Sequence, residues 1–218
     1  MPTKILIAVD FDGTLSKRDS VQALLEHFAD PLWKKLEQDW LDSKISAAQC
    51  MQEQMRMVKA DQTQLEHFFQ GIELDSGFLA FYEYVKQFAE VIIVSDGLDI
   101  AIQRALQGAG LPEVKVFANR LHFLEDGIAI SHPYKNPSCQ NGNGVCKCAV
   151  VQGFEPGMVI LIGDGRSDTC LASRADIVFA KERLAEYCLI HGIPFHSFET
   201  FHDVLAQMTS WFEAIEAS

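Results

Sequence analysis

The amino-acid sequence predicts an α/β fold in which helices cover both faces of a parallel sheet and a helical segment is inserted after the first strand. Three observations support this prediction. Residues 5–9 are apolar at every position, residues 19–69 show a helical period with no strand among them, and strands alternate with helices after about residue 75. A strand without polar positions fits a sheet that is buried on both faces, as parallel sheets are.

The segment 19–69 predicts four amphipathic helices. Apolar residues recur at the spacing that gives a helix one apolar face, as in the run from Val21 to Phe28. Asp61 and Gln64 match a capping box at the start of the fourth helix. We therefore expect a small helical bundle inserted into a larger domain. The alternative is four helices that pack directly on the sheet.

Beyond this insert, helices and strands are expected to alternate, as the chain of an α/β domain does. The expected helices cover 77–88, 98–108 and 167–173, and the expected strands cover 91–94, 114–117, 158–162 and 177–179. Residues 122–131 predict a hairpin that turns at Asp126-Gly127, a favoured two-residue turn. A loop rich in glycine and cysteine at 136–146 leads into a further short helix.

Composition excludes several classes of function. The 218 residues include 18 Lys and Arg against 30 Asp and Glu, so the net charge is −12 and binding to a phosphate backbone is disfavoured. No apolar run reaches the roughly 18 residues of a membrane span, and the apolar run at 5–9 is too short for a signal peptide. Six cysteines in a chain of this length do not make a disulfide scaffold. We expect a soluble cytoplasmic protein with reduced thiols, without nucleic-acid or membrane partners; its oligomeric state cannot be read from the sequence.

Two carboxylates follow the first strand directly. Asp10 and Asp12 are costly to bury without a compensating charge. A hard cation such as Mg²⁺ would neutralise them, and one acid could then act as a nucleophile while the other serves as a general acid and base. Gly13 lets the backbone approach a ligand, and Thr14 offers a hydroxyl group.

Two later loops are expected at the same edge of the sheet, because ligands of parallel sheets bind at the carboxyl ends of the strands. Ser95, Asp96 and Gly97 follow the expected strand 91–94 and would offer a hydroxyl and backbone N–H groups to an anion, although a serine there is more often a helix cap. Asp164 is placed for metal ligation. Asp168 falls in a first helical turn, where an acid is favourable in any case.

Taken in order, these residues resemble the four motifs of the haloacid-dehalogenase-like phosphohydrolases. The motifs are Asp-x-Asp-x-Thr at 10–14, a strand ending in Ser95, a lysine, and Gly-Asp-x-x-x-Asp at 163–168. The resemblance is to the phosphoserine-phosphatase-like branch. It is closer to the methionine-salvage phosphatases that act on 2-hydroxy-3-keto-5-methylthiopentenyl-1-phosphate, because of the Cys- and Gly-rich segment 139–148. It implies a Rossmann-like core formed by 1–16 and 75–218 and a helical cap formed by 17–74.

The resemblance also implies the chemistry. Asp10 would attack phosphorus and form an aspartyl phosphate, and Asp12 would protonate the leaving oxygen and then activate water. Lys147 would neutralise the charge between nucleophile and phosphate. Lys135 is the alternative lysine, but it lies in a proline-flanked loop, whereas Lys147 begins an apolar helix before the strand 158–162.

The implied binding residues form two groups. A Mg²⁺ ion would be held by Asp10, Asp12 through its backbone carbonyl, Asp164 and Asp168. The substrate and its phosphoryl group would be held by Thr14, Ser95, Asp96, Gly97 and Asp19. Phosphoserine phosphatases have a glutamate that faces the substrate amine at the place of Asp19; an aspartate there could equally cap the helix that follows.

The sequence thus predicts a Mg²⁺-dependent phosphatase for a small phosphorylated metabolite. One alternative is a phosphotransferase or phosphomutase that uses the same aspartyl phosphate but excludes water. Another is a non-catalytic binding protein that keeps the fold, although the costly charge cluster argues against it. Cys139, Cys146 and Cys148 are a further open question, because three thiols at this spacing are only a weak zinc signal.

Overall fold

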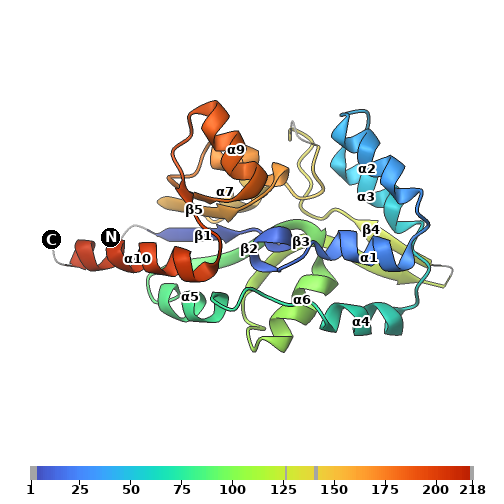
Figure 1. Cartoon of the computed structure of the whole chain (residues 1–218), viewed down its shortest axis with the longest axis horizontal. Helices are drawn as coiled ribbons and strands as arrows, with labels where there is room; N and C mark the ends of the chain where they lie inside the picture. Colours follow the sequence, from blue (N-terminus) through green and yellow to red (C-terminus); the bar gives the residue numbers. More distant parts are fainter. Residues whose placement is uncertain (1–3, 126, 140–141, 217–218) are drawn as a thin grey trace.

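The computed structural model describes residues 4–125, 127–139 and 142–216, and a seven-stranded sheet lies at its centre (Figure 1). Its strands are β1 Ile5–Val9, β2 Ala89–Leu98, β3 Lys115–Leu124, β4 Gly127–Ser131, β5 Met158–Gly163, β6 Ile177–Ala180 and β7 His196–Ser197. Their order is β4-β3-β2-β1-β5-β6-β7, and only the β3–β4 pair among these strands is antiparallel. The expected α/β fold with a mostly parallel sheet is confirmed.

Helices surround this sheet. They are α1 Ser20–Phe28, α2 Trp33–Leu41, α3 Ala47–Met55, α4 Gln62–Gln70, α5 Phe78–Val85, α6 Asp99–Gly108, α7 Lys147–Gln152, α8 Thr169–Ala172, α9 Glu182–His191 and α10 Phe201–Glu216. The capping box expected at Asp61 and Gln64 begins α4, with each side chain accepting a hydrogen bond from the other residue's backbone N–H. None of the described helices is long and apolar enough to cross a membrane.

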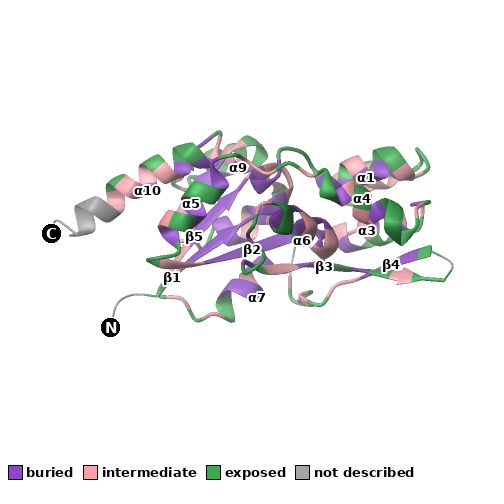
Figure 2. Cartoon of the chain, turned by 90° about the horizontal axis from the view of Figure 1, so that it is seen from below, coloured by how far each residue is buried: buried purple, intermediate pink, exposed green. Residues whose placement is uncertain are grey.

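The two faces of the sheet are covered by different helices. Ile7, Val9 and Ile93 point to one face, where they pack against apolar side chains of α5, α6 and α10. Leu6 and Ala8 point to the other face, which α7, α8 and α9 cover. Figure 2 shows the buried positions on the strands between these helix layers. Successive residues of β1 are therefore both buried, which explains why the strand is apolar at every position.

The register of the central strands brings three chain segments to one edge. β1 lies between β2 and β5, with Val9 opposite Ile93 on one side and Ile162 on the other. The backbone N–H of Asp10 then donates to the carbonyl of Ile162, 2.9 Å away. The carboxyl ends of β1, β2 and β5 consequently meet, as the sequence predicted from their parallel arrangement.

The two ends of the insert between β1 and α5 lie side by side. Ser16 and Leu74 pair as an isolated β-bridge, and the N–H of Lys17 donates to the carbonyl of Glu73 at 3.0 Å. Helices α1 and α4 share an apolar cluster with α6 and the β3–β4 hairpin, which includes Leu98 and Ile130. The insert is thus not packed on itself alone: Trp33 of α2 and Met55 of α3 belong to the same apolar cluster, and in Figure 1 α2 and α3 lie above α1 while α4 lies below it.

Several element boundaries differ from the sequence prediction. The expected strand 91–94 continues through Ser95–Gly97 to Leu98, because β2 resumes pairing with β3 at Leu98–Asn119. The strand expected at 114–117 and the first hairpin strand form one continuous β3, and Asp126 of the expected turn lies outside the described residues. The helix expected at 167–173 is split into a 3₁₀ turn, Arg166–Asp168, and α8. α9, β7 and α10 were not predicted.

Phe201 provides a test of how α10 is held on the sheet. Its fully buried ring contacts Phe78 and Phe81 of α5, with ring centroids 5.0 and 5.1 Å apart. We expect Phe201→Ala to lower the free energy of unfolding by about 3–5 kcal/mol, because it removes buried area and leaves a cavity. Chemical denaturation measures this loss. The control Leu189→Ala, at a site 71% exposed, should change stability by no more than about 0.5 kcal/mol.

Candidate active site

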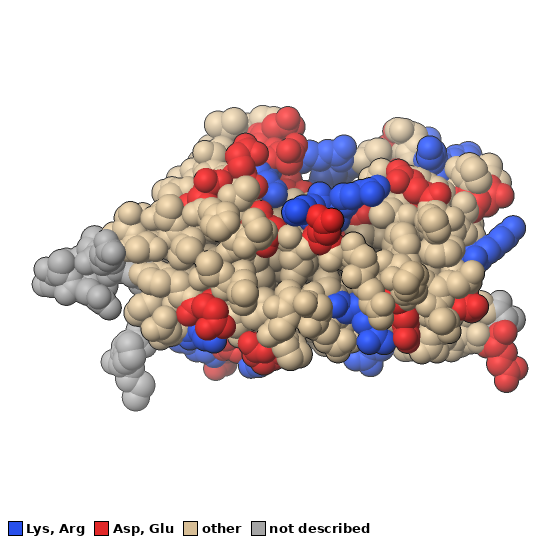
Figure 3. All heavy atoms as spheres, turned by 60° about the horizontal axis from the view of Figure 1, so that its bottom comes forward, with Lys and Arg blue, Asp and Glu red and all other residues tan. Residues whose placement is uncertain are grey.

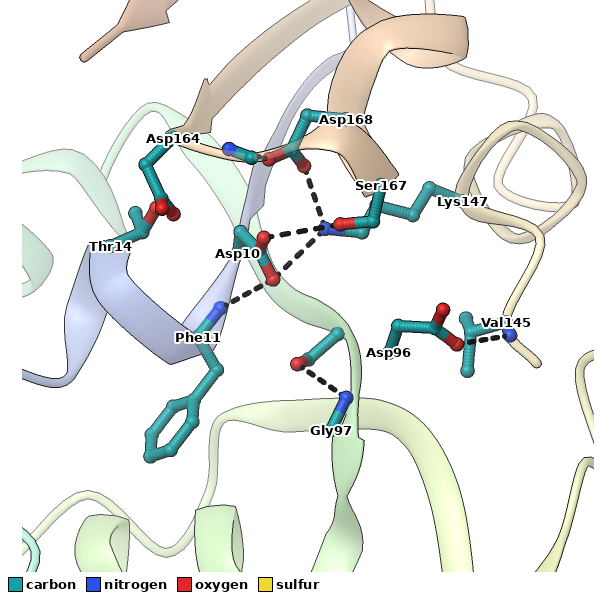
Figure 4. Close-up of polar contacts among 12 residues, drawn as sticks. Asp10, Phe11, Thr14, Asp96, Gly97, Val145, Lys147, Asp164, Ser167 and Asp168 are labelled. Atoms are coloured by element: carbon teal, nitrogen blue, oxygen red, sulfur yellow. Dashed lines mark hydrogen bonds and ion pairs between the residues drawn. The ribbon is translucent and has the colours of Figure 1, made fainter. Parts of the chain in front are cut away.

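Asp10 lies where β1 ends, and its carboxylate is held from several directions (Figure 4). The backbone N–H of Phe11 donates to Oδ1 at 2.7 Å, and the ammonium of Lys147 lies 2.9 Å from the same oxygen. The hydroxyl of Ser167 donates to Oδ2 over a longer 3.4 Å. Asp10 is only 6% exposed, so these contacts replace most of the solvent that a carboxylate normally requires. Oδ2 remains the less engaged oxygen.

Lys147 is the cation of the site. It is 3% exposed at the first position of α7, and its Nζ also donates to Oδ1 of Asp168 at 2.6 Å. Burial alone would lower the pKa of Lys147, but the charges of Asp10 and Asp168 outweigh it and raise that pKa above its ordinary value. Lys147 therefore stays charged. Lys135, the alternative lysine, is exposed on the loop surface.

Three carboxylates meet beside this ammonium group. Asp10, Asp164 and Asp168 each present an oxygen, and these oxygens all lie within 4.8 Å of one another. Burial, together with the charge of Asp10, raises the pKa of Asp164 to about 6 and that of Asp168 to about 8. Thr14 donates a hydrogen bond to Asp164. One ammonium does not balance three acids, so the site has an excess of negative charge that a divalent cation with oxygen ligands would compensate.

Asp12 faces away from this cluster. Its Oδ1 accepts a 2.7 Å hydrogen bond from the N–H of Ser20 at the start of α1. Its Oδ2 lies against Gly97, where a Cβ atom would approach it to 2.3 Å. Burial and the charge of Asp19 raise the pKa of Asp12 well above its ordinary value. Of the four acids predicted to hold a metal, the structure gathers three side chains; Asp12 could take part only through its backbone carbonyl.

Ser95 and Asp96, which follow Val94, direct their side chains to different places. Ser95 is buried beside the cluster, and its Oγ accepts from the N–H of Gly97 at 3.0 Å. Asp96 turns the other way, and its Oδ1 accepts from the N–H of Val145 at 2.9 Å. Figure 4 shows this carboxylate directed at Val145 and away from Asp10. Two corrections follow: the Asp96 carboxylate is bound to the loop at Val145 and is directed away from Asp10, and Ser95 does not cap a helix, because α6 begins only at Asp99.

Asp19 occupies the helix-cap position. Its Oδ1 accepts a 2.7 Å hydrogen bond from the N–H of Gln22, which is the cap geometry that the sequence left open. It is close enough to Asp12 for its charge to affect that group. Cys139, Cys146 and Cys148 are free thiols. Within the ranges that the structure describes, they do not gather with other ligands as the three aspartates do.

Three residues with contacts at or near the site were not predicted from the sequence. Ser167 lies inside the last motif, where a hydroxyl between two acids was the available signal. Asn119 is a fully buried polar residue on β3, and it binds Asp96. The guanidinium of Arg166 lies 5.4 Å from the ring centroid of Trp40 on α2 of the insert. Only the folded chain brings this last pair together, since 126 positions separate the two residues.

Comparison with known proteins places the chain in a family. The family described as "Putative Phosphatase" matches residues 5–217. The chain is 32% identical, over 94% of its own length and 90% of the relative's, to the 2-hydroxy-3-keto-5-methylthiopentenyl-1-phosphate phosphatase of Bacillus pumilus (strain SAFR-032). It is 30% identical to the protein of the same name from Geobacillus kaustophilus (strain HTA426), over 94% of this chain and 96% of the relative.

Solved structures share the fold. Phosphoserine phosphatase from T. onnurineus, in complex with NDSB-201, superimposes with a TM-score of 0.70 at 14% identity and covers 94% of each chain. A phospho-aspartyl intermediate analogue of phosphoserine phosphatase gives a TM-score of 0.65 at 21% identity, over 94% of this chain and 99% of that one. Together with the sequence matches, these likenesses confirm the family expected from the motifs. The chain belongs to the family described as "Putative Phosphatase" and is an enzyme of the phosphatase class.

Proposed function

We propose that this phosphatase hydrolyses a small phosphomonoester with the help of Mg²⁺ and through an aspartyl phosphate on Asp10. One observation supports the proposal above all. The carboxylate of Asp10 is buried at the end of β1, is held by an ammonium group and a backbone N–H, and keeps its Oδ2 largely unengaged. An ionised, oriented carboxylate with a free oxygen is what attack on phosphorus requires.

The metal would be held by Asp10, Asp164 and Asp168, together with the backbone carbonyl of Asp12. The raised pKa values of Asp164 and Asp168 are consistent with this assignment, because they come first from burial and then from the negative charge of Asp10 beside them. When bound, Mg²⁺ would draw charge from the phosphoryl oxygens and lessen their repulsion by the carboxylates. Lys147 adds a second positive charge on the side of Asp10 that faces α7.

In the first step, Oδ2 of Asp10 forms a bond to phosphorus while the bond from phosphorus to the leaving oxygen breaks. Asp12 supplies the proton for that oxygen, since burial and Asp19 favour its protonated form. In the second step, Asp12 accepts a proton from water as the water oxygen bonds to phosphorus and the bond to Asp10 breaks. Thr14 and Ser95, with the N–H of Gly97, would hold the phosphoryl oxygens at this edge.

We further propose that residues 17–74 act as a cap over the site. Trp40 on α2 contacts Arg166, and the N–H of Ala48 on α3 donates to the carbonyl of Gly142 at 3.4 Å. With these two contacts in place, the cap would admit only small substrates to the site and would exclude bulk water. Acidic and basic side chains are interspersed on the face shown in Figure 3, and the net charge of −12 opposes binding of a polyanion.

A small phosphorylated metabolite with a short apolar tail, of the kind named for the curated relatives, is the substrate class we favour. Met55 and Phe69 are fully buried core residues of the insert and are unsuited to line a pocket. Met51 is only partly buried, and its Sδ lies 3.5 Å from the amide of Asn119, which binds Asp96. Release of inorganic phosphate without an added acceptor distinguishes hydrolysis from transfer to a second substrate.

Asp10→Asn tests the nucleophile. The amide keeps the shape of the side chain but cannot form the acyl phosphate, so we expect phosphate release from small phosphomonoesters to fall by at least about 100-fold while the protein still unfolds cooperatively. The matched control is Asp42→Asn on the exposed surface of the insert, which should retain full activity. A rate for the Asp10 variant within tenfold of wild type would contradict the mechanism.

Removal of divalent cations tests the metal. The three aspartates carry more negative charge than Lys147 balances, so we expect activity to disappear in excess EDTA and to return with added Mg²⁺. Asp164→Asn should raise the Mg²⁺ concentration for half-maximal activity by about 10- to 100-fold. Undiminished phosphate release in EDTA would exclude a metal-assisted reaction.

Replacing each of the two lysines tests which one supplies the positive charge beside Asp10. Lys147→Ala should lower kcat/KM by at least about 100-fold, because it removes a buried charge that contacts the nucleophile, whereas Lys135→Ala should have little effect. Loss of Lys147 also leaves Asp10 and Asp168 without their shared cation, so unfolding curves must accompany the kinetics. A larger kinetic effect at Lys135 would reverse the assignment.

A further inference from the structure

Asn119 joins three segments that meet beside the active site. It lies on β3, is completely buried, and donates through Nδ2 to the backbone carbonyl of Asp96 at 2.6 Å and to Oδ1 of the same residue at 3.2 Å. Its Oδ1 lies 2.7 Å from Nδ1 of His132, beyond the β3–β4 hairpin. A buried amide with partners on both of its atoms is fixed in orientation.

Chemistry decides which way this amide points. The carbonyl of Asp96 can only accept a hydrogen bond, so it must face the NH₂ group of Asn119. The amide oxygen then faces His132, whose Nδ1 must carry a proton and donate. Burial lowers the pKa of His132, which favours the neutral ring with its single proton on Nδ1. His132 thereby holds the amide of Asn119 against rotation.

Two hydrogen bonds connect Asn119 to the loop that precedes Lys147. Oδ1 of Asp96, which Asn119 contacts, accepts the backbone N–H of Val145 at 2.9 Å. Val145 is fully buried and precedes Lys147 by two residues, at the point where the loop enters α7. The same Asp96 directly follows Ser95, whose hydroxyl accepts from Gly97. Asn119 therefore fixes the end of β2 and the start of α7 relative to each other.

Gly144 shows how closely the loop is packed on this network. A Cβ atom at Gly144 would lie 2.3 Å from Oδ1 of Asn119 and 2.5 Å from Nδ1 of His132. Such distances leave no room for a side chain unless Asn119 or His132 moves. The loop before Lys147 is thus seated directly on the amide–imidazole pair.

We propose that Asn119 is a positioning residue for phosphoryl transfer, holding Lys147 and Ser95 in register through Asp96 and Val145. This inference rests on the roles of Lys147 and Ser95 in the proposed function. Asn119 does not touch the reacting atoms itself. Its contribution is to keep two groups, supplied by segments about 50 residues apart in the sequence, aligned with Asp10.

The first test replaces Asn119 by aspartate, which has the same shape but presents an acceptor to Asp96. We expect kcat for phosphate release to fall by about 10- to 100-fold while KM changes far less. The reason is that the alignment of Lys147 and Ser95 with Asp10 affects the chemical step more than substrate binding. Asn119→Ala is the second variant if the aspartate variant does not unfold cooperatively. The matched control is His122→Gln, which loses a 2.7 Å contact with Ser131 on the exposed side of the same hairpin. It should keep wild-type kcat.

A double-mutant cycle separates positioning from general structural damage. If Asn119 acts through Lys147, its replacement in a Lys147→Ala background should lower kcat/KM by less than about threefold. Lys147→Gln replaces the alanine background if that variant fails to fold. An equal loss in both backgrounds would overturn the inference and leave the proposed function intact. Unchanged activity of Lys147→Ala itself would instead overturn the proposed function.

Discussion

The buried contact of Lys147 with Asp10 and Asp168 is the interaction on which the rest of the site depends. An isolated carboxylate in the interior would protonate, and an isolated ammonium would lose its proton, because the low dielectric disfavours either charge alone. In the folded protein Nζ of Lys147 lies 2.9 Å from Asp10 and 2.6 Å from Asp168, and the charges of these two acids raise the pKa of Lys147 above its ordinary value, so its ammonium stays charged. Three acids against one base leave an excess of negative charge that a divalent cation could balance, as proposed above.

The sheet provides the geometry that this charge cluster requires. Asp10 ends β1, Asp164 and Asp168 follow β5, and Lys147 begins α7, which packs on the face of the sheet made by Leu6 and Ala8. β1 is covered on both faces and paired on both sides, so the position of Asp10 cannot shift without disturbing the core. A rigid support of this kind limits the motion of catalytic groups more than a surface loop would.

The insert meets the sheet domain in two different ways. On one side, α1 and α4 share apolar contacts with α6 and the β3–β4 hairpin. Other contacts are polar or aromatic, as between Trp40 and Arg166 and between Ala48 and Gly142, although Met55 of α3 also lies in the apolar cluster. Apolar burial makes the first contact persistent, whereas exposed polar contacts of the second kind exchange readily with water.

The sequence by itself determined the fold class of this protein and the residue types of its candidate active site. Local sequence patterns were enough to predict the α/β class, the capping box at Asp61 and the motifs that contain Asp10, Ser95, Lys147 and Asp164. Each of these features depends on residues that are neighbours in the sequence. Tertiary structure alone decided the direction of Asp12 and Asp96, the extension of β2 to Leu98, and the link from Asn119 to Lys147. Those features depend on packing between segments far apart in the sequence, and residue periodicity carries no information about such contacts.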